Sequence, residues 1–149
     1  MTNFNRTANW LKACGKEQGN TGHITTQLGC VIEEFTELLS RIKTHDCEAY
    51  KLMIGAIADL EKVAKAFKHG YADAYFLHKD RTEVLDAFCD IEVTVNGLAY
   101  LLAMDKEKAD ALVLDSNDDK LVDGNPVILP GGKIGKPAGW RAPDLLGCV

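Results

Sequence analysis

The chain has 149 residues, enough for one domain with a hydrophobic core of its own. Its composition, 46% hydrophobic and 26% charged, is ordinary for a globular protein. A net charge of −5 excludes a general electrostatic attraction to nucleic acid, and the chain lacks the uninterrupted run of about 18 apolar residues that would suggest a membrane span. Five cysteines without a Cys-x-x-Cys pair favour reduced thiols and a cytoplasmic location.

Apolar periodicity predicts two helices in the first third of the chain. The first is expected over about 3–17 and ends near Gly15 or Gly19. The second begins near Thr25 or Thr26 and runs to about Lys43. Its apolar stripe, expected to face the core, consists of Ile24, Leu28, Val31, Phe35, Leu39 and Ile42.

Two longer helices and a short one are expected next. The third covers about 47–69, before a C-terminal Gly70, and its apolar side is formed by Leu52, Ile57, Leu60, Ala64 and Phe67. Residues 71–79 are ambiguous and compatible with a short helical turn. The fourth, about 80–104, is expected to be central and largely buried, with Ile91, Val93, Val95, Leu98, Leu101 and Leu102. A break near Asp105 opens a fifth helix to about Ser116.

The last part of the chain is rich in residues that form turns. Glycine and proline at 123–126, 130–132 and 136–139 indicate turns, and residues 127–129 favour one short strand. We therefore predict an all-α fold, a four-to-five-helix bundle over 1–122, with a non-helical tail over 123–149. Trp140 indicates that the tail is docked on the bundle or on a partner subunit. The tail either covers an apolar patch or acts as a lid that brings Lys133, Lys136 or Arg141 near phosphate.

Two groups of acidic residues carry the functional prediction. Glu83, Asp86 and Asp90 fall within roughly 60° of one another on one face of the fourth helix. On the second helix Glu34 and Glu37 border the apolar stripe. Glu33 points away, toward solvent, a lysine or a neighbouring subunit.

Clustered carboxylates are costly to bury unless a positive charge neutralises them. The alternatives for these acids are a solvated acidic face or ion pairs with buried Lys or Arg. Facing helices would instead make an oxygen-rich cage suited to Mg²⁺. A di-iron carboxylate site is excluded because no histidine follows a glutamate at the required spacing of three.

Four segments resemble a known family. They are Gln27–Leu39 with its Glu-Glu-x-x-Glu pattern, Asp86–Ile91 followed by Val95-Asn96-Gly97, Ser116–Lys120, and the ending Gly135–Leu145. Together they resemble the all-α nucleoside triphosphate pyrophosphohydrolases of the MazG type, in their bacteriophage form, over about residues 22–121. One departure is that Glu83-x-x-Asp86 lies farther from Glu37 than the family spacing. The second ligand pair is therefore Asp86 with Asp90 or Asp86 with Glu83, and we favour the former.

The resemblance implies hydrolysis of a (deoxy)nucleoside triphosphate, with purine dNTPs such as dGTP or dATP favoured, to the monophosphate and pyrophosphate. The implied catalytic residues are Glu34, Glu37, Asp86 and Asp90, and the metal ligands are drawn from Glu33, Glu34, Glu37, Glu83, Asp86 and Asp90. The cofactor would be two or three Mg²⁺ ions, with Mn²⁺ as a substitute.

The same resemblance assigns the substrate contacts. Phosphate would be bound by Asn117 and Lys120, with Lys65 or Arg41 as weaker candidates. The base would be bound by Asn9 or Trp10, although Trp10 is also compatible with a core role. We further expect a homodimer or homotetramer, located in the host cytoplasm if phage-encoded. The alternative function is a non-catalytic helical nucleotide-binding or assembly module.

Overall fold

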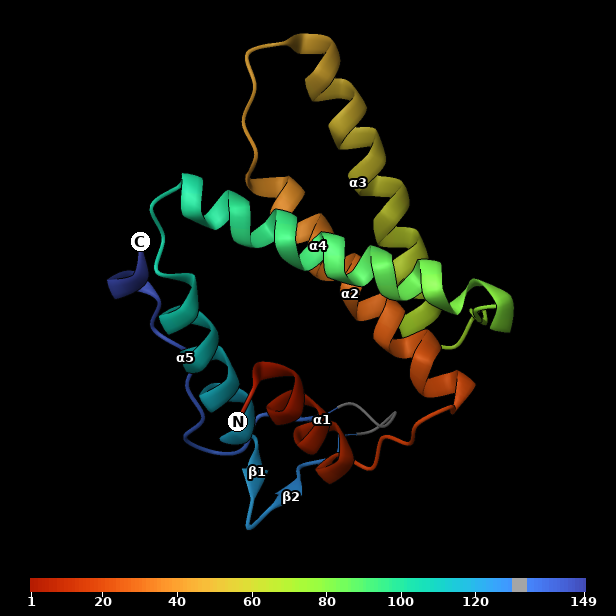
Figure 1. Cartoon of the computed structure of the whole chain (residues 1–149), viewed down its shortest axis with the longest axis vertical. Coiled ribbons are helices and arrows are strands. Elements are labelled where there is room, and N and C mark those ends of the chain that lie inside the picture. The colour runs from red at the N-terminus through yellow and green to blue at the C-terminus, as the bar shows by residue number, and fades with distance from the viewer. Residues whose placement is uncertain (130–133) are drawn as a thin grey trace. The chain divides into compact units, whose positions relative to one another are not determined.

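The computed structural model, which describes residues 1–129 and 134–149, is all-α, as predicted (Figure 1). Within the described residues the helices are α1 (Asn3–Ala13), α2 (Thr21–Arg41), α3 (Cys47–Lys68), α4 (Arg81–Leu101) and α5 (Lys106–Asp118). Short 3₁₀ helices span His78–Asp80 and Leu146–Cys148. Strands β1 (Leu121–Val122) and β2 (Asn125–Pro126) form an antiparallel pair.

The chain divides into two compact units. The hairpin unit, residues 17–77, contains α2 and α3. The terminal unit, residues 1–16 and 78–149, contains α1, α4, α5 and the tail. The predicted boundary between residues 122 and 123 stays a prediction.

Side-chain caps fix where the helices begin. Thr2, Asn20, Asp46 and Asp105 each accept a hydrogen bond from a first-turn amide of the helix that follows. These are the residue types preferred at N-caps, because they satisfy amides that have no partner inside the helix. Helix α1 ends at Ala13 and not near 17, because Gly15 takes φ +72° and the Lys16 amide turns back to the Leu11 carbonyl at 2.9 Å.

The predicted strand over 127–129 is wrong. The described residues there contain a single bridge between Ile128 and Ile134. The regular ladder forms earlier, because Asp123 (φ 52°) and Gly124 (φ 77°) both adopt the left-handed conformation. Asp-Gly with two positive φ values is the preferred two-residue connection of a hairpin. The predicted turn at 130–132 lies outside the described residues, as does Lys133.

Helices α2 and α3 pack as an antiparallel hairpin through small residues (Figure 1). Gly29 on α2 lies against Ala64 and Lys68 on α3, and a Cβ at Gly29 would be 2.9 Å from the Ala64 carbonyl oxygen. Thr25 and Thr36 are the other buried residues of α2. The Thr25 hydroxyl donates to a backbone carbonyl and accepts from the Ala74 amide at 3.0 Å, which fastens the segment after α3 to the start of α2.

The predicted core face of α2 is therefore wrong for much of its length. Val31 and Phe35 are 50% and 51% exposed, and Ile42 is exposed as well. The buried face is turned by about 100° toward Thr25, Gly29 and Thr36. Small residues form this contact because they let the two helix backbones approach closely. The threonine hydroxyls that are buried there form hydrogen bonds with nearby backbone groups. On α3, Ala64 is buried and Ile57, Leu60 and Phe67 are half-buried as predicted, whereas Leu52 is exposed.

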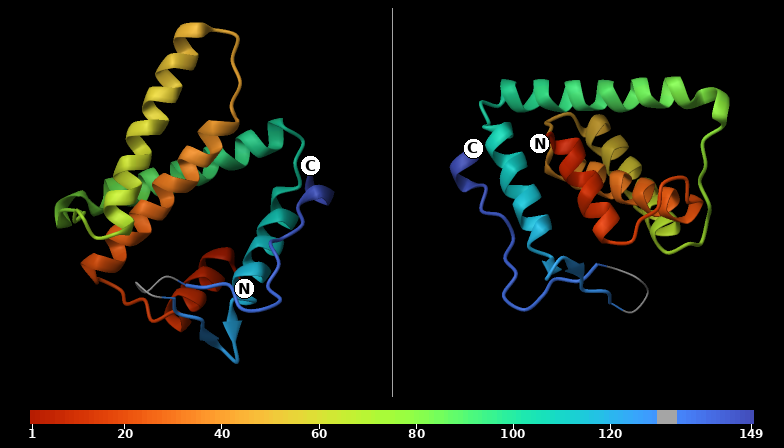
Figure 2. Two further views of the ribbon diagram at one scale, coloured as in Figure 1. Left: turned by 180° about the vertical axis from the view of Figure 1, so that it is seen from behind. Right: turned by 60° about the horizontal axis from the view of Figure 1, so that its bottom comes forward.

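Helix α4 is not a buried central element in the single chain. Only Ala99 is buried, whereas Val93 is 68% and Leu101 80% exposed. The chain bends by 118° between the segment His78–Leu101 and α5 (Figure 2). Among the described residues no single helix is long and apolar enough to cross a membrane. The two segments of the bent pair, taken together, do reach the required length and apolar composition.

We predict that Gly29→Ala lowers the stability of the protein. The added methyl would meet backbone atoms of α3 at 2.9–3.0 Å, an overpacking that typically costs about 1–3 kcal/mol. Gly55→Ala is the matched control on α3, because no atom outside the local backbone of its own helix lies within 4 Å of the place that a Cβ would take there. Alanine also favours a helix over glycine by up to about 1 kcal/mol. Thermal unfolding measures both, and a melting temperature for Gly29→Ala at or above that of the parent would refute the close contact.

We also predict a homo-oligomer, at least a dimer. The side of α4 away from its acids carries Phe88, Val95 and Leu102, all exposed in the single chain. Contiguous apolar surface of this kind typically marks a contact with another chain. Light scattering at micromolar concentration should give at least twice the chain mass, and Phe88→Lys should lower it. A monomer mass for the parent protein would contradict the prediction.

Candidate functional site

The C-terminal end of α5 is the place where the terminal unit gathers its polar and aromatic groups. The Trp10 indole on α1 donates to the Asn117 carbonyl at 2.8 Å, and the Trp140 indole in the tail donates to the Ser116 carbonyl at 2.8 Å. Carbonyls of a last helical turn have no partner within the helix. The Trp140 indole supplies the donor to the Ser116 carbonyl, whereas the Asn117 carbonyl also accepts from the Lys120 amide at 3.1 Å. The two indole N–H groups hold α1 and the tail against the same turn of α5.

A lysine lies beside both indoles. The Lys120 ammonium donates to the Asn117 side-chain oxygen at 2.8 Å. It lies 6.0 Å from the ring centre of Trp10 and 5.4 Å from that of Trp140. Lys136 approaches the Trp140 ring at 4.3 Å. Cations attract aromatic faces at these distances, so Trp140 attracts both Lys120, which is predicted to bind phosphate, and Lys136.

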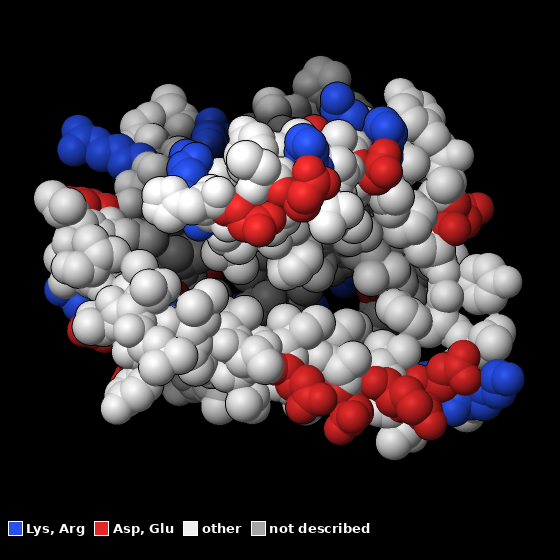
Figure 3. Space-filling model, turned by 90° about the horizontal axis from the view of Figure 1, so that it is seen from above, with Lys and Arg blue, Asp and Glu red and all other residues white. Residues whose placement is uncertain are grey.

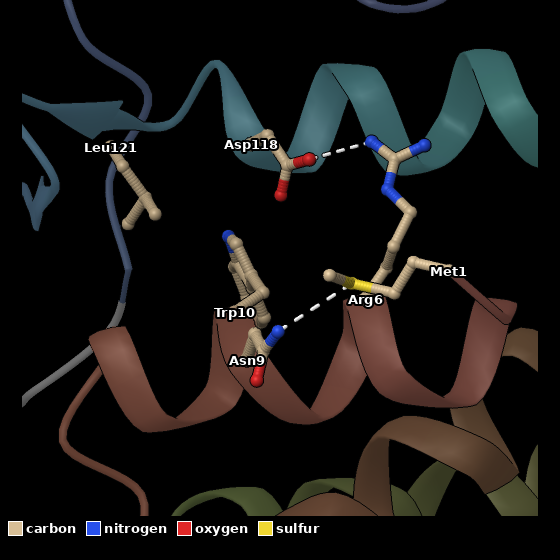
Figure 4. A pocket seen from close by; sticks show the side chains of 6 residues that line it. All are labelled: Met1, Arg6, Asn9, Trp10, Asp118 and Leu121. Carbon is tan, nitrogen blue, oxygen red and sulfur yellow. Dashed lines mark hydrogen bonds and ion pairs between the residues drawn. The ribbon is translucent and has the colours of Figure 1, made fainter.

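A cavity of about 440 Å³ opens beside this cluster (Figure 4). The residues that line it are Met1 before α1, three residues of α1, the last residue of α5 and the first of β1: Met1, Arg6, Asn9, Trp10, Asp118 and Leu121. Its volume lies within the range of about 300–1,000 Å³ that small-molecule sites occupy. An aromatic ring, an amide and an ion pair converge on it, which is a lining suited to a planar polar ligand.

Arg6 and Asp118 form one side of the cavity, and Asp115 holds Arg6 from outside the lining. The guanidinium donates to Asp115 at 2.7 Å and to Asp118 at 2.6 Å. Hydrogen bonds from Arg6 to Asp118 and then to Asp115 raise the pKa of the guanidinium above its already high value. Arg6 therefore stays charged and fixes the orientation of Asp118, the one carboxylate of the two that lines the cavity.

The acids of α2 lie in the hairpin unit and differ in their surroundings. Glu34 and Glu37 are exposed, whereas Glu33 forms an ion pair with Lys68 of α3. The lysine was one of the three partners predicted for Glu33. The hydrogen bond from Lys68 to Glu33 raises the pKa of the ammonium, and the charges of Glu33, Cys30 and Glu34 act in the same direction against desolvation. Of the predicted metal ligands on α2, Glu33 is thus already neutralised by a protein cation.

The acids of α4 lie in the terminal unit and are all exposed. Glu83, Asp86 and Asp90 follow one face of the helix, and Figure 3 shows acidic side chains gathered along the lower edge of the view, where α4 lies. Within either unit, among the described residues, no three His, Cys, Asp or Glu side chains converge as a metal site. A cage that combines the acids of α2 and α4 draws on both units and stays a prediction.

The structure brings four predicted substrate-binding residues together. Asn9 and Trp10, predicted for the base, and Asn117 and Lys120, predicted for phosphate, meet around the end of α5. Lys65, the third predicted phosphate ligand, is an exposed residue of α3 in the hairpin unit. Sequence reasoning missed Arg6 and Asp118, because an ion pair between residues 112 positions apart leaves no periodic signal.

Comparisons with protein-family models, with curated proteins and with solved structures each found no match for this chain.

We predict that Glu33→Gln weakens the hairpin unit in a pH-dependent manner. The folded-state pKa of Lys68 is raised above its unfolded value, so the pair stabilises fully below about pH 10.5 and its contribution is lost as the pH rises through the folded-state pKa. A partly exposed pair contributes about 0.2–1 kcal/mol. The parent should unfold at a higher denaturant concentration than the variant, by the same amount from pH 7 to 9. This difference should shrink above about pH 10.5, where Lys68 loses its charge.

Glu37→Gln is the matched control, because this exposed carboxylate on the next turn of α2 makes no ion pair with any described residue. An equal effect of the two substitutions at pH 8 would show that the loss comes from helix charge and not from the contact with Lys68.

Proposed function

We propose that the protein hydrolyses a (deoxy)nucleoside triphosphate to the monophosphate and pyrophosphate with Mg²⁺ as cofactor. The observation that carries the proposal is that Asn9 and Trp10 line one cavity while Asn117 and Lys120 lie beside Trp10, since the two pairs were assigned to base and phosphate from separate segments of the chain. The motif resemblance of Gln27–Leu39 and Asp86–Ile91 supplies the reaction class.

The substrate's two ends have suitable partners in the terminal unit. The Trp10 ring offers a face on which a base can stack, and stacking on an aromatic side chain contributes about 1–3 kcal/mol per base. Lys120 and Lys136, both held near Trp140, offer positive charge to phosphate oxygens. The Asn117 amide nitrogen is a donor for the same group, while its oxygen holds Lys120.

The exposed carboxylates fit the cofactor in their chemistry. Glu34, Glu37, Asp86 and Asp90 present oxygen ligands only, and all four are exposed. Hard divalent cations such as Mg²⁺ prefer such oxygens and keep several waters. Bound to these residues, two or three Mg²⁺ ions would neutralise the triphosphate and lower the pKa of an attacking water. The proposal requires acids of α2 and of α4 to act together.

We predict that Glu34→Gln and Asp86→Asn each abolish turnover and leave the helical fold intact. Both substitutions remove a ligand charge at nearly constant volume, and loss of a metal ligand costs at least about tenfold in activity. Pyrophosphate release from each dNTP, with Mg²⁺ and with EDTA, measures the effect, and circular dichroism monitors the fold. Glu61→Gln, an exposed acid of α3 outside both motifs, is the control for charge removal.

More than about a tenth of the parent activity in both variants would remove the metal-cage hypothesis. Nucleotide binding without pyrophosphate release from any dNTP would favour a non-catalytic binding module instead.

A further inference from the structure

The Asp118 carboxylate is the one charged acceptor that the cavity beside α5 presents among its described lining residues. One of its oxygens accepts from Arg6 at 2.6 Å, and Figure 4 shows the other turned toward the space above Trp10. Each carboxylate oxygen has two lone-pair sites, so both oxygens can accept further hydrogen bonds while Arg6 is bound. The group is held in place by Arg6, which is itself fixed by Asp115 from outside the cavity lining.

We propose that this cavity selects guanine and that Asp118 reads the base, an inference that rests on the proposed function and names its substrate class. Guanine presents two adjacent donors, N1–H and the N2 amino group, to a partner with two acceptor oxygens. Trp10 provides the stacking face on the α1 side. Asp118 thus acts as the specificity-determining residue of the base site.

The other bases match a carboxylate less well. Adenine places its N6 donor beside the N1 acceptor, and cytosine places its N4 donor beside the N3 acceptor, so one carboxylate oxygen would face a lone pair. Thymine has a single N3–H between two carbonyl oxygens. Asp118 is exposed in the free protein, but a base stacked on Trp10 would cover its oxygens, and an acceptor covered without a donor costs binding energy. This asymmetry gives the selectivity.

Arg6 limits the repulsion that a carboxylate would exert on the nucleotide. The guanidinium bonds to both Asp115 and Asp118, so one of the two negative charges at this edge of the site is neutralised. The Lys136 ammonium adds positive charge beside Trp140, 4.3 Å from the centre of its ring. One end of the site thus offers a carboxylate to the donors of the base, and the other end offers lysines to the phosphates.

The first arm of the test uses the parent protein and needs no variant. Isothermal titration with dGMP, dIMP and dAMP compares three purines, of which dIMP lacks only the N2 amino group. The proposal expects dGMP to bind about tenfold more tightly than dIMP, and dAMP to bind more weakly than dGMP by at least as much. Equal affinity for dGMP and dIMP overturns the proposal.

The second arm compares Asp118→Asn with Asp115→Asn. Both substitutions remove one negative charge from an Arg6 partner, but only Asp118 lines the cavity. We expect Asp118→Asn to lose about 10-fold to 100-fold in dGMP affinity and in kcat/KM for dGTP, and to gain relative preference for adenine, because an amide offers one donor and one acceptor. Asp115→Asn should keep the guanine preference. An unchanged dGMP-to-dAMP ratio in folded Asp118→Asn overturns the assignment of Asp118.

The two proposals fail separately. Pyrophosphate release from several dNTPs without any guanine preference in the parent protein overturns guanine selection and leaves the hydrolase intact. Selective dGMP binding that Asp118→Asn abolishes, without pyrophosphate release from any dNTP, supports the base site and removes the hydrolase.

Discussion

The terminal unit depends on two hydrogen bonds from indole N–H groups to the last turn of α5. Trp10 and Trp140 donate at 2.8 Å to neighbouring carbonyls, those of Asn117 and Ser116. Loss of the Trp140 donor to the Ser116 carbonyl would cost about 1–3 kcal/mol, whereas the Asn117 carbonyl would keep the Lys120 amide as a donor. Both contacts favour one arrangement of α1, α5 and the tail. The tail is further held at the other end of α5, where the Asp105 amide donates to the Cys148 carbonyl at 2.9 Å. One helix thus fixes both ends of the chain.

This arrangement also decides the charge of the candidate site. The C-terminal end of a helix carries a partial negative charge, and Asp115 and Asp118 add to it on α5. Arg6 and Lys120 compensate that charge from two sides, through the carboxylates and through the Asn117 amide. The cavity is therefore neither strongly acidic nor strongly basic. That balance suits an uncharged base at one end and an anionic phosphate chain near the lysines at the other.

The sequence predicted those features that depend on residues close together in the chain, and it failed for those that depend on contacts between distant segments. Helix existence follows from residues within four positions of one another, and all five predicted helices are present. The break and cap near Asp105 were predicted, but α2 begins at Thr21 with Asn20 as its cap and not near Thr25 or Thr26. The packing face of α2 was wrong because apolar periodicity points to Val31 and Phe35, whereas the contact with α3 uses Gly29 and its neighbours. Close backbone approach decided that contact, and hydropathy does not measure it.

In the candidate site, too, residues that form a local motif were predicted, whereas residues paired across the chain were not. Asn117 and Lys120 were singled out because their spacing resembles a local motif, and they lie beside Trp10, while their binding roles stay predictions. The pairing of Arg6 with Asp118 could not be predicted from the sequence. Charged residues are common on surface helices, and only the fold shows which two of them form an ion pair. Trp140 was recognised as a docked residue but not as a cap, since the carbonyl it satisfies belongs to a helix 24 residues away.

The exposed apolar side chains connect folding with association. Among the described residues the buried apolar side chains are Cys14, Ala64, Ala99 and Cys148, and no large side chain is fully buried. Burial of apolar surface is the main favourable term in folding, at roughly 25 cal/mol per Å², and four small side chains supply little of it. The faces of α2 and α4 hold the missing surface, at Phe35 and Phe88 among others. Because covering those faces stabilises only the folded chain, the stability of this protein should rise with its own concentration, as it does for any chain whose folding is linked to binding.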